Sequence, residues 1–131
     1  MCMPTAPPAA CKAPTMRSSK MRRLVESRTA DLARAFDLTD ALGRTVSDYS
    51  TGMTKKIMLA GAMIHSPRVL VLDEPFESVD PVSAANIEDV LRSYTATGGT
   101  VIVSSHSMDL VQRMCDHVAV IAAGRVLAAG T

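Results

Sequence analysis

Apolar residues recur along this 131-residue chain with two different spacings. In three segments they fall three or four residues apart, as on a helix with one buried face. The predicted helices run from Arg22 to Phe36, from Tyr49 to His65, and from Asp80 to the Gly98-Gly99 pair that closes the third. A shorter helix is predicted after Ser107. Apolar runs without helical spacing predict strands at 69–72, 100–104, 117–121 and 126–129. Alternating strands and helices predict an α/β fold with a mostly parallel sheet.

Local signals mark where these elements start and stop. Ser66-Pro67 ends the second helix, and Asp80-Pro81 opens the third with an acidic N-cap and a proline at the first helical position. The apolar face of this third helix is predicted to consist of Ala84, Ile87, Val90, Leu91 and Tyr94. The apolar run at 69–72 shows no alternation, which predicts a strand buried on both faces.

The composition divides the chain into three parts. Residues 1–21 contain Pro4, Pro7, Pro8 and Pro14, and they are predicted to be a disordered tail or the product of a misplaced start. Residues 22–66 form a helical part, and residues 67–131 form the α/β core. The net charge of +1 and the 3% aromatic content argue against a nucleic-acid partner, and the three cysteines are expected to be reduced thiols. No apolar run reaches the roughly 20 residues of a membrane-spanning helix.

The strongest chemical signal is the pair of acids Asp73 and Glu74, which directly follows an apolar strand. Ligands bind at the carboxyl ends of strands in open α/β sheets. Two acids placed there without a cation are costly to bury, and a metal ion bound to phosphate oxygens would offset that cost. An exposed acidic turn is the alternative explanation, so the neighbouring motifs decide between the two.

Four motifs occur in a fixed order: Tyr49–Met53, Val69–Glu74, Ser78–Asp80 and His106. In this order and spacing they resemble the signature, the Walker B motif, the D-loop and the switch histidine of the ATP-binding cassette (ABC) ATPases. The resemblance covers about residues 22–131. It implies a partial P-loop-NTPase-like core, preceded by part of the helical subdomain that carries the signature.

The resemblance also implies roles for single residues. Asp73 is expected to hold Mg²⁺ through water, Glu74 to act as the general base on the attacking water, and His106 to contact the γ-phosphate of ATP. The signature residues Ser50, Thr51, Gly52 and Met53, together with Asp80, are expected to lie against the ATP of a second subunit, because a helix N-terminus favours anions.

Departures from the family pattern refine this interpretation. The sequence Tyr-Ser-Thr-Gly-Met at 49–53 replaces the common Leu-Ser-Gly-Gly-Gln and resembles a variant of bacterial export-type subunits. Lys55 and Lys56, which follow it, are interpreted as solvated helix charges. No Gly-x-x-x-x-Gly-Lys-Ser/Thr loop occurs in the 131 residues. The chain is therefore expected to represent the C-terminal portion of such a domain and to be inactive alone.

The function that the resemblance implies is that of an ATP-hydrolysing subunit of a bacterial-type transporter of the export type. It would dimerise head-to-tail with a second ATPase subunit and bind a transmembrane permease at the cytoplasmic face of the membrane. Two alternatives stay open: a non-catalytic fragment that donates signature contacts to a complete partner, and a soluble ABC ATPase that acts on nucleic acid or ribosomes. The family resemblance also places the strand of the phosphate-binding loop between the strands at 100–104 and 117–121, so these two must close that gap or leave their facing edges unpaired.

Overall fold

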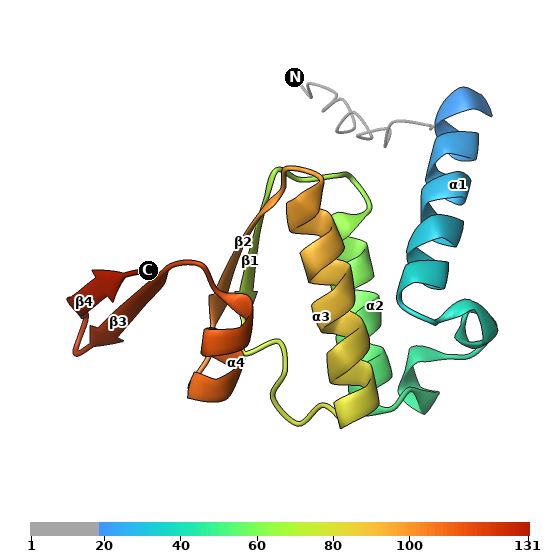
Figure 1. The fold of residues 1–131 in the computed structure, drawn as a ribbon. Helices are drawn as coiled ribbons and strands as arrows, with labels where there is room; N and C mark the ends of the chain where they lie inside the picture. The colour runs from blue at the N-terminus through green and yellow to red at the C-terminus, as the bar shows by residue number, and fades with distance from the viewer. Residues whose placement is uncertain (1–18) are drawn as a thin grey trace, which may run out of the picture.

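The computed structural model describes residues 19–131, and the predicted tail at 1–18 lies outside them. The α-helices and strands follow in the order α1 (Ser19–Ala35), α2 (Thr51–Met63), β1 (Val69–Asp73), α3 (Pro81–Ala96), β2 (Thr100–Ser104), α4 (Met108–Met114), β3 (Val118–Ala122) and β4 (Arg125–Gly130), with two short 3₁₀ turns, η1 (Thr39–Ala41) and η2 (Val46–Asp48), between α1 and α2 (Figure 1). α1 begins at Ser19, so residues 19–21, expected in the tail, belong to a helix.

Both central helices start at the caps that the sequence indicates. The Ser50 hydroxyl accepts a hydrogen bond of 3.2 Å from the Met53 N–H at the start of α2. Asp80 accepts one of 2.9 Å from the Ser83 N–H at the start of α3, where Pro81 takes the first helical position. The two helix N-termini therefore satisfy donors that would otherwise lack partners.

The sheet is divided into two separate pairs of strands. β1 and β2 are parallel, in a register that runs from Val69 opposite Thr100 to Asp73 opposite Ser104. β3 and β4 form an antiparallel hairpin that turns at Ala123 and Gly124, both with positive φ. The parallel pairing that the sequence predicts is thus confined to β1 and β2 among the described residues.

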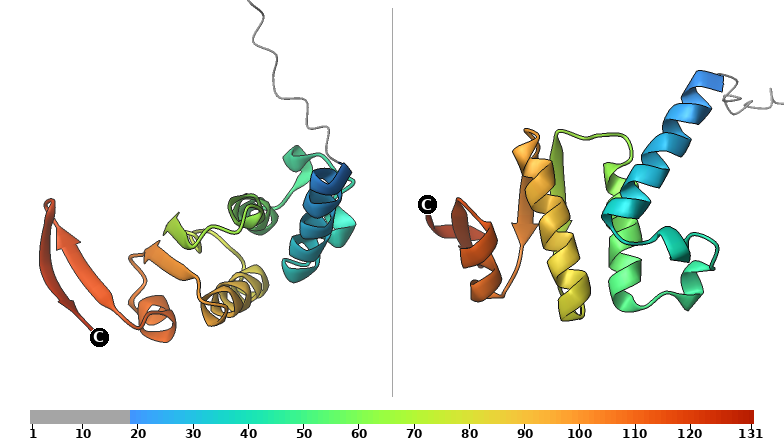
Figure 2. Two further views of the ribbon diagram at one scale, coloured as in Figure 1. Left: turned by 90° about the horizontal axis from the view of Figure 1, so that it is seen from above. Right: turned by 45° about the vertical axis from the view of Figure 1, so that its right-hand side comes forward.

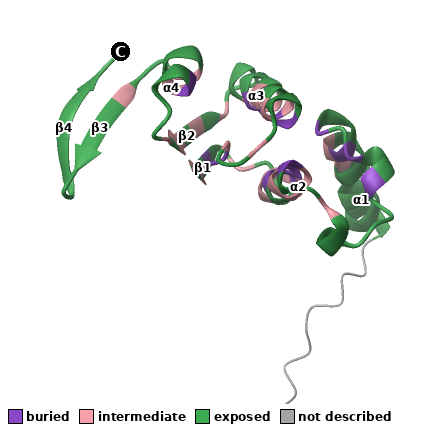
Figure 3. Ribbon diagram, turned by 90° about the horizontal axis from the view of Figure 1, so that it is seen from below, coloured by how far each residue is buried: buried purple, intermediate pink, exposed green. Residues whose placement is uncertain are grey.

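The core lies between the helices and one face of β1 (Figure 3). The four largest fully buried side chains are those of Phe36, Leu38, Ile87 and Leu91. Ile87 and Leu91 confirm the predicted apolar face of α3. The sequence predicts a buried stripe of Ile57, Ala60, Gly61 and Ile64 on α2, and this is only partly right. Ala60 is buried and Ile57 packs against the core, whereas Gly61 is exposed and the other buried positions are Gly52, Lys56 and Leu59.

Burial of β1 and β2 differs from the prediction. Leu70 is 4% exposed, whereas Val71 is 73% exposed and Ile102 is 54% exposed. Neither strand is covered on both faces, because α2 and α3 pack against one face and no described element covers the other (Figure 2). An unbroken apolar run shows that both faces suit an apolar environment. It does not show that other elements among the described residues pack against both faces.

The strands β2 and β3 do not pair with each other. They belong to different sheets, and in Figure 2 the hairpin stands apart from β1 and β2, with α4 on the chain between β2 and β3. Of the two outcomes expected for the missing central strand, the structure shows the unclosed gap. The edge of β2 that faces away from β1 therefore presents unpaired backbone groups beside exposed apolar side chains.

We expect the isolated chain to be marginally stable or to self-associate. Each backbone group left without a partner costs roughly 1–3 kcal/mol where water is excluded, against a typical stability of about 5–15 kcal/mol for a whole domain. Urea unfolding combined with size-exclusion chromatography tests this expectation. Val71→Lys should reduce association without loss of stability, because this side chain is 73% exposed. A monomer with one cooperative transition above about 5 kcal/mol would contradict the expectation.

Candidate functional site

Three predicted site residues lie at the carboxyl ends of β1 and β2, which are the lower ends of these two strands in Figure 1. Asp73 is the last residue of β1, Glu74 follows it, and His106 lies two residues after the end of β2. The His106 Nδ1 is 2.9 Å from the Glu74 Oε1. Parallel pairing of the two strands is what brings these side chains together, since parallel strands end at the same edge.

The contact between His106 and Glu74 is the main influence on the pKa of His106. The hydrogen bond from His106 to Glu74 and the attraction of the Glu74 charge raise the pKa of His106 above its ordinary value. The side chains are 77% exposed for His106 and 31% exposed for Glu74, and Asp73 is exposed. The acids are therefore not buried among the described residues, which corrects the expectation of a desolvated strand end.

We expect a ¹H–¹⁵N NMR titration to give His106 a pKa above about 6.5. Glu74→Gln should lower it, because the amide carries no charge. Glu77→Gln is the matched control and should lower it less, since Glu77 acts on His106 only through its charge at longer range. The raised pKa means that the contact stabilises the fold fully below the unfolded pKa and that this contribution is lost as the pH rises through the folded pKa. An unchanged titration curve in Glu74→Gln would show that the contact does not persist in solution.

The backbone of Glu74 is fixed from two sides. Its N–H donates to the carbonyl of Ser104 at 3.2 Å and to the Ser104 hydroxyl at 3.1 Å. Its carbonyl accepts a hydrogen bond of 3.1 Å from the Lys55 Nζ of α2. Glu74 also has a φ of 42°, in the left-handed region that few non-glycine residues adopt. The contacts of Lys55 and Ser104 with Glu74 were not predicted from the sequence.

The prediction that Lys55 and Lys56 are solvated helix charges is wrong. Lys55 donates to Glu74, and Lys56 is only 6% exposed. The reason is geometric: Lys56 lies four residues after Gly52 on the face of α2 that meets the core, where its long aliphatic stem packs. The sequence could have indicated this burial, because Lys56 falls at helical spacing from Gly52, Leu59 and Ala60 on the buried face of α2.

The predicted signature residues surround the start of α2, beside the start of α3. Ser50 caps the helix by accepting from Met53, which leaves its own hydroxyl hydrogen free to donate. Thr51 is exposed, and Met53 is partly buried against the core. Gly52 is buried, and its position is set by the neighbouring helix. A Cβ on Gly52 would lie 2.6 Å from the Ser83 Oγ and 2.7 Å from an Asp80 carboxylate oxygen.

Asp80 is exposed and sits at the N-terminus of α3. Hydrogen bonds from the Ser83 backbone and side chain lower the pKa of Asp80, so its carboxylate is kept charged. The structure thus brings Gly52 and Asp80 together within one subunit. Within this chain, α3 is what requires a residue without a side chain at position 52.

A metal ion would find only part of a site here. Among residues 19–131, no three His, Cys, Asp or Glu side chains are grouped so that they could hold a metal. Asp73 therefore offers one carboxylate, with Glu74 next to it. Mg²⁺ bound with a nucleotide takes most of its ligands from water and phosphate oxygens and only one or two carboxylates from the protein. The residues present fit that kind of ion and do not form a metal cage of their own.

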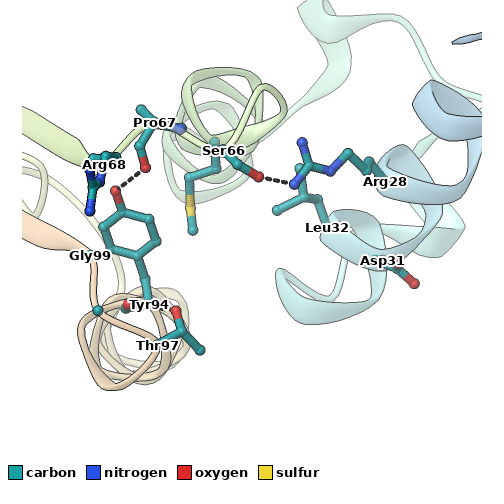
Figure 4. Close-up of a pocket in the computed structure, with 11 residues that line it drawn as sticks. Arg28, Asp31, Leu32, Ser66, Pro67, Arg68, Tyr94, Thr97 and Gly99 are labelled. Atoms are coloured by element: carbon teal, nitrogen blue, oxygen red, sulfur yellow. Dashed lines mark hydrogen bonds between the residues drawn. The ribbon is translucent and has the colours of Figure 1, made fainter.

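Two cavities lie at opposite ends of β1. The smaller, about 260 Å³, is lined by Glu74, His106 and neighbouring loop residues. The larger, about 550 Å³, lies between α1, the end of α2 and the end of α3 (Figure 4). There the Arg28 guanidinium donates to Ile64 O and Ser66 Oγ, and the Tyr94 hydroxyl donates to Pro67 O at 2.6 Å. These polar groups join the helices to one another, whereas the smaller cavity borders the predicted site residues Glu74 and His106.

The chain is similar to several known proteins. A family model described as "AAA domain, putative AbiEii toxin, Type IV TA system" matches residues 8–112. The chain is 38% identical over 109 residues to the daunorubicin resistance ATP-binding protein DrrA3 of Streptomyces coeruleorubidus, covering 83% of this chain and 34% of that protein. It is 37% identical over 108 residues to the Nod factor export ATP-binding protein I of Rhizobium leguminosarum bv. viciae, covering 82% and 35%.

Solved structures agree with these relatives. A structure described as the ATP binding subunit of an ABC transporter superposes with a TM-score of 0.74 at 30% identity, covering 83% of this chain and 45% of that one. Another, cbiO1 from Clostridium perfringens, part of the ABC transporter complex cbiONQ, gives a TM-score of 0.74 at 27% identity, with 88% and 46% covered. The chain spans about a third of the length of the curated relatives. No helix within residues 19–131 has both the length and the apolar character needed to cross a bilayer.

Proposed function

Because this chain belongs to the AAA-domain family and is similar to the ATP-binding proteins of ABC transporters, we propose that it serves as the part of a transporter subunit that activates water for ATP hydrolysis. The contact between His106 and Glu74 at the carboxyl ends of β1 and β2 carries this proposal. An exposed acidic turn, the alternative for Asp73 and Glu74, would not require a histidine from a second strand within hydrogen-bonding distance.

Each residue has a role that its position supports. Glu74 accepts the proton of the attacking water, since its carboxylate faces the small cavity that also borders His106. His106 orients Glu74 and meets the terminal phosphate. Asp73 is the residue that would hold Mg²⁺, which supplies neutralisation of phosphate charge when bound. The charge on His106 itself favours an anionic ligand at this edge, because its raised pKa increases the protonated fraction near neutral pH.

The start of α2 is proposed to serve a second ATP site. Ser50, Thr51, Gly52 and Met53 present a helix N-terminus and a free hydroxyl hydrogen, which together attract phosphate oxygens. Asp80 lies beside them at the start of α3. We assign these residues to the ATP of a second ATPase subunit in a head-to-tail dimer. A transmembrane permease subunit would hold the dimer at the cytoplasmic face of the membrane.

Export is the proposed direction of transport. The relatives named above are a daunorubicin resistance protein and a Nod factor export protein. Their similarity to this chain covers the signature region as well as the acids. Affinity purification of the tagged chain from detergent-solubilised membranes of its own cells tests the permease assignment. Recovery of a protein with several membrane spans is expected, and its repeated absence under conditions that retain the second ATPase subunit contradicts that assignment.

The catalytic proposal is tested in a joined subunit, defined as residues 19–131 fused behind the portion of DrrA3 that precedes the matched region. This protein should hydrolyse ATP only when Mg²⁺ is present. A joined subunit that binds ATP and stays folded but shows no Mg²⁺-dependent turnover would rule out the catalytic role. If it then restored turnover to a partner with a damaged signature, the non-catalytic alternative would be favoured.

A further inference from the structure

Ser104, the last residue of β2, contacts both acids of the site. It lies directly opposite Asp73 in the parallel register. Its hydroxyl donates to the Asp73 Oδ1 and accepts a hydrogen bond of 3.1 Å from the Glu74 N–H. Its carbonyl accepts from the same N–H at 3.2 Å. One side chain therefore contacts two successive residues across the strand pair.

The local backbone explains why such a contact is needed. With a φ of 42°, Glu74 is in a conformation that a non-glycine residue keeps only when its surroundings hold it there. The chain turns at this point, and the Glu77 N–H donates back to the Glu74 carbonyl at 3.2 Å. Without the Ser104 hydroxyl, the Glu74 N–H would keep a single acceptor, and the peptide could relax toward an extended conformation. The Glu74 carboxylate would then leave the Nδ1 of His106.

The hydroxyl also fixes the carboxylate of Asp73. That side chain is exposed, so solvent does not hold it in one orientation. A hydrogen bond to one carboxylate oxygen restrains rotation of the group about its last torsion, which is otherwise broad. Groups that orient a metal-binding carboxylate commonly change metal affinity or activity when they are removed.

We propose that Ser104 is a positioning residue that holds Asp73 and Glu74 together in their working orientations. This inference rests on the proposed function. Ser104 acts through the two acids and is not assigned any contact with nucleotide. Its neighbours cannot replace it: Val103 precedes it on the opposite face of the strand, and the Ser105 hydroxyl accepts from the Ser107 N–H instead.

The first test uses the 131-residue chain itself. Hydrogen exchange is followed by mass spectrometry on a peptide that covers residues 70–78. Ser104→Ala should speed exchange there at least threefold relative to Thr100→Ala, a matched control that loses a hydroxyl at the other end of β2. Ser104→Thr, which keeps the hydroxyl, should restore slow exchange. Equal exchange in Ser104→Ala and Thr100→Ala would overturn the proposal.

The second test uses the joined subunit. Ser104→Ala should lower kcat by about 10-fold to 100-fold while the KM for ATP changes less than about twofold, since the residue orients acids and does not bind nucleotide. Ser104→Thr should recover most of kcat. Should Ser104→Ala fail to fold, Ser104→Cys keeps the volume with a weak donor and should show the same loss. Full kcat in Ser104→Ala, or no recovery in Ser104→Thr, would overturn the proposal. Absence of turnover in the unmodified joined subunit would count against the proposed function, and the exchange result would still decide the role of Ser104.

Discussion

The Glu74→Gln variant of the joined subunit should bind ATP as tightly as the unmodified protein and hydrolyse it about 100-fold to 10,000-fold more slowly. The amide keeps the shape of the side chain and can still meet His106, which lies 2.9 Å from the carboxylate. It cannot accept the proton of the attacking water. Binding should be retained because the substitution leaves the fused portion of the ATP-binding protein DrrA3 unchanged. Dimers that hold unhydrolysed ATP should therefore accumulate.

The measurements are the steady-state rate, the ATP affinity and the fraction of dimer by size-exclusion chromatography with ATP. Asp89→Asn is the matched control, because it makes the same acid-to-amide change at an exposed position of α3 away from the acids. It should leave all three values unchanged. Turnover in Glu74→Gln that equals that of Asp89→Asn would remove Glu74 from the role of general base.

The 131-residue chain alone should bind ATP at least about 1,000-fold more weakly than the joined subunit, with no detectable heat of binding at millimolar nucleotide. A phosphate-binding loop surrounds the phosphates with several backbone N–H groups and a lysine, and no Gly-x-x-x-x-Gly-Lys-Ser/Thr sequence occurs in these residues. The α2 N-terminus and His106 are too few donors to replace it. Isothermal titration calorimetry with MgATP measures the difference.

The joined subunit serves as the positive control in the same buffer. Binding by the isolated chain at micromolar ATP would mean that its own helix N-termini and His106 form a sufficient phosphate site. In that case the Asp80→Asn variant would show whether the site lies near α3, because removal of this negative charge should then tighten binding. The His106→Ala variant would show whether it lies at the ends of β1 and β2.

Structural features that depend on residues close together in the chain could be predicted from the sequence. The Asp80-Pro81 start of α3 and its Ile87 and Leu91 face agree with the structure because caps and helical spacing act locally. The placement of Asp73, Glu74 and His106 at the ends of neighbouring strands could also be predicted, because parallel strands end at the same edge. The contact between His106 and Glu74 itself was not predicted and comes from the structure.

Burial and contacts that depend on elements distant in the chain could not be predicted in this way. The exposure of Val71 depends on which elements cover the sheet, and an apolar run carries no information about that. Lys56 was assigned to solvent on charge alone, although its position on α2 places the aliphatic stem in the core. The role of Ser104 arises from register, which aligns it with Asp73 across a gap of 31 residues in the chain.

The close packing of Gly52 on α3 constrains how this part of the molecule can evolve. The space that a side chain at position 52 would need is already occupied by Ser83 and Asp80, at 2.6 Å and 2.7 Å from the place of a Cβ. Sizes at positions 52 and 83 should therefore covary: the Ser83 Cβ itself would lie 2.8 Å from a new Cβ, so an alanine at 52 should be tolerated only when 83 is glycine and the Asp80 carboxylate turns away. In a library that randomises both codons, selection should enrich pairs with a small combined volume rather than particular residues at either site. The signature and the start of α3 would then be inherited as one unit, so that recombination between relatives should preserve them together.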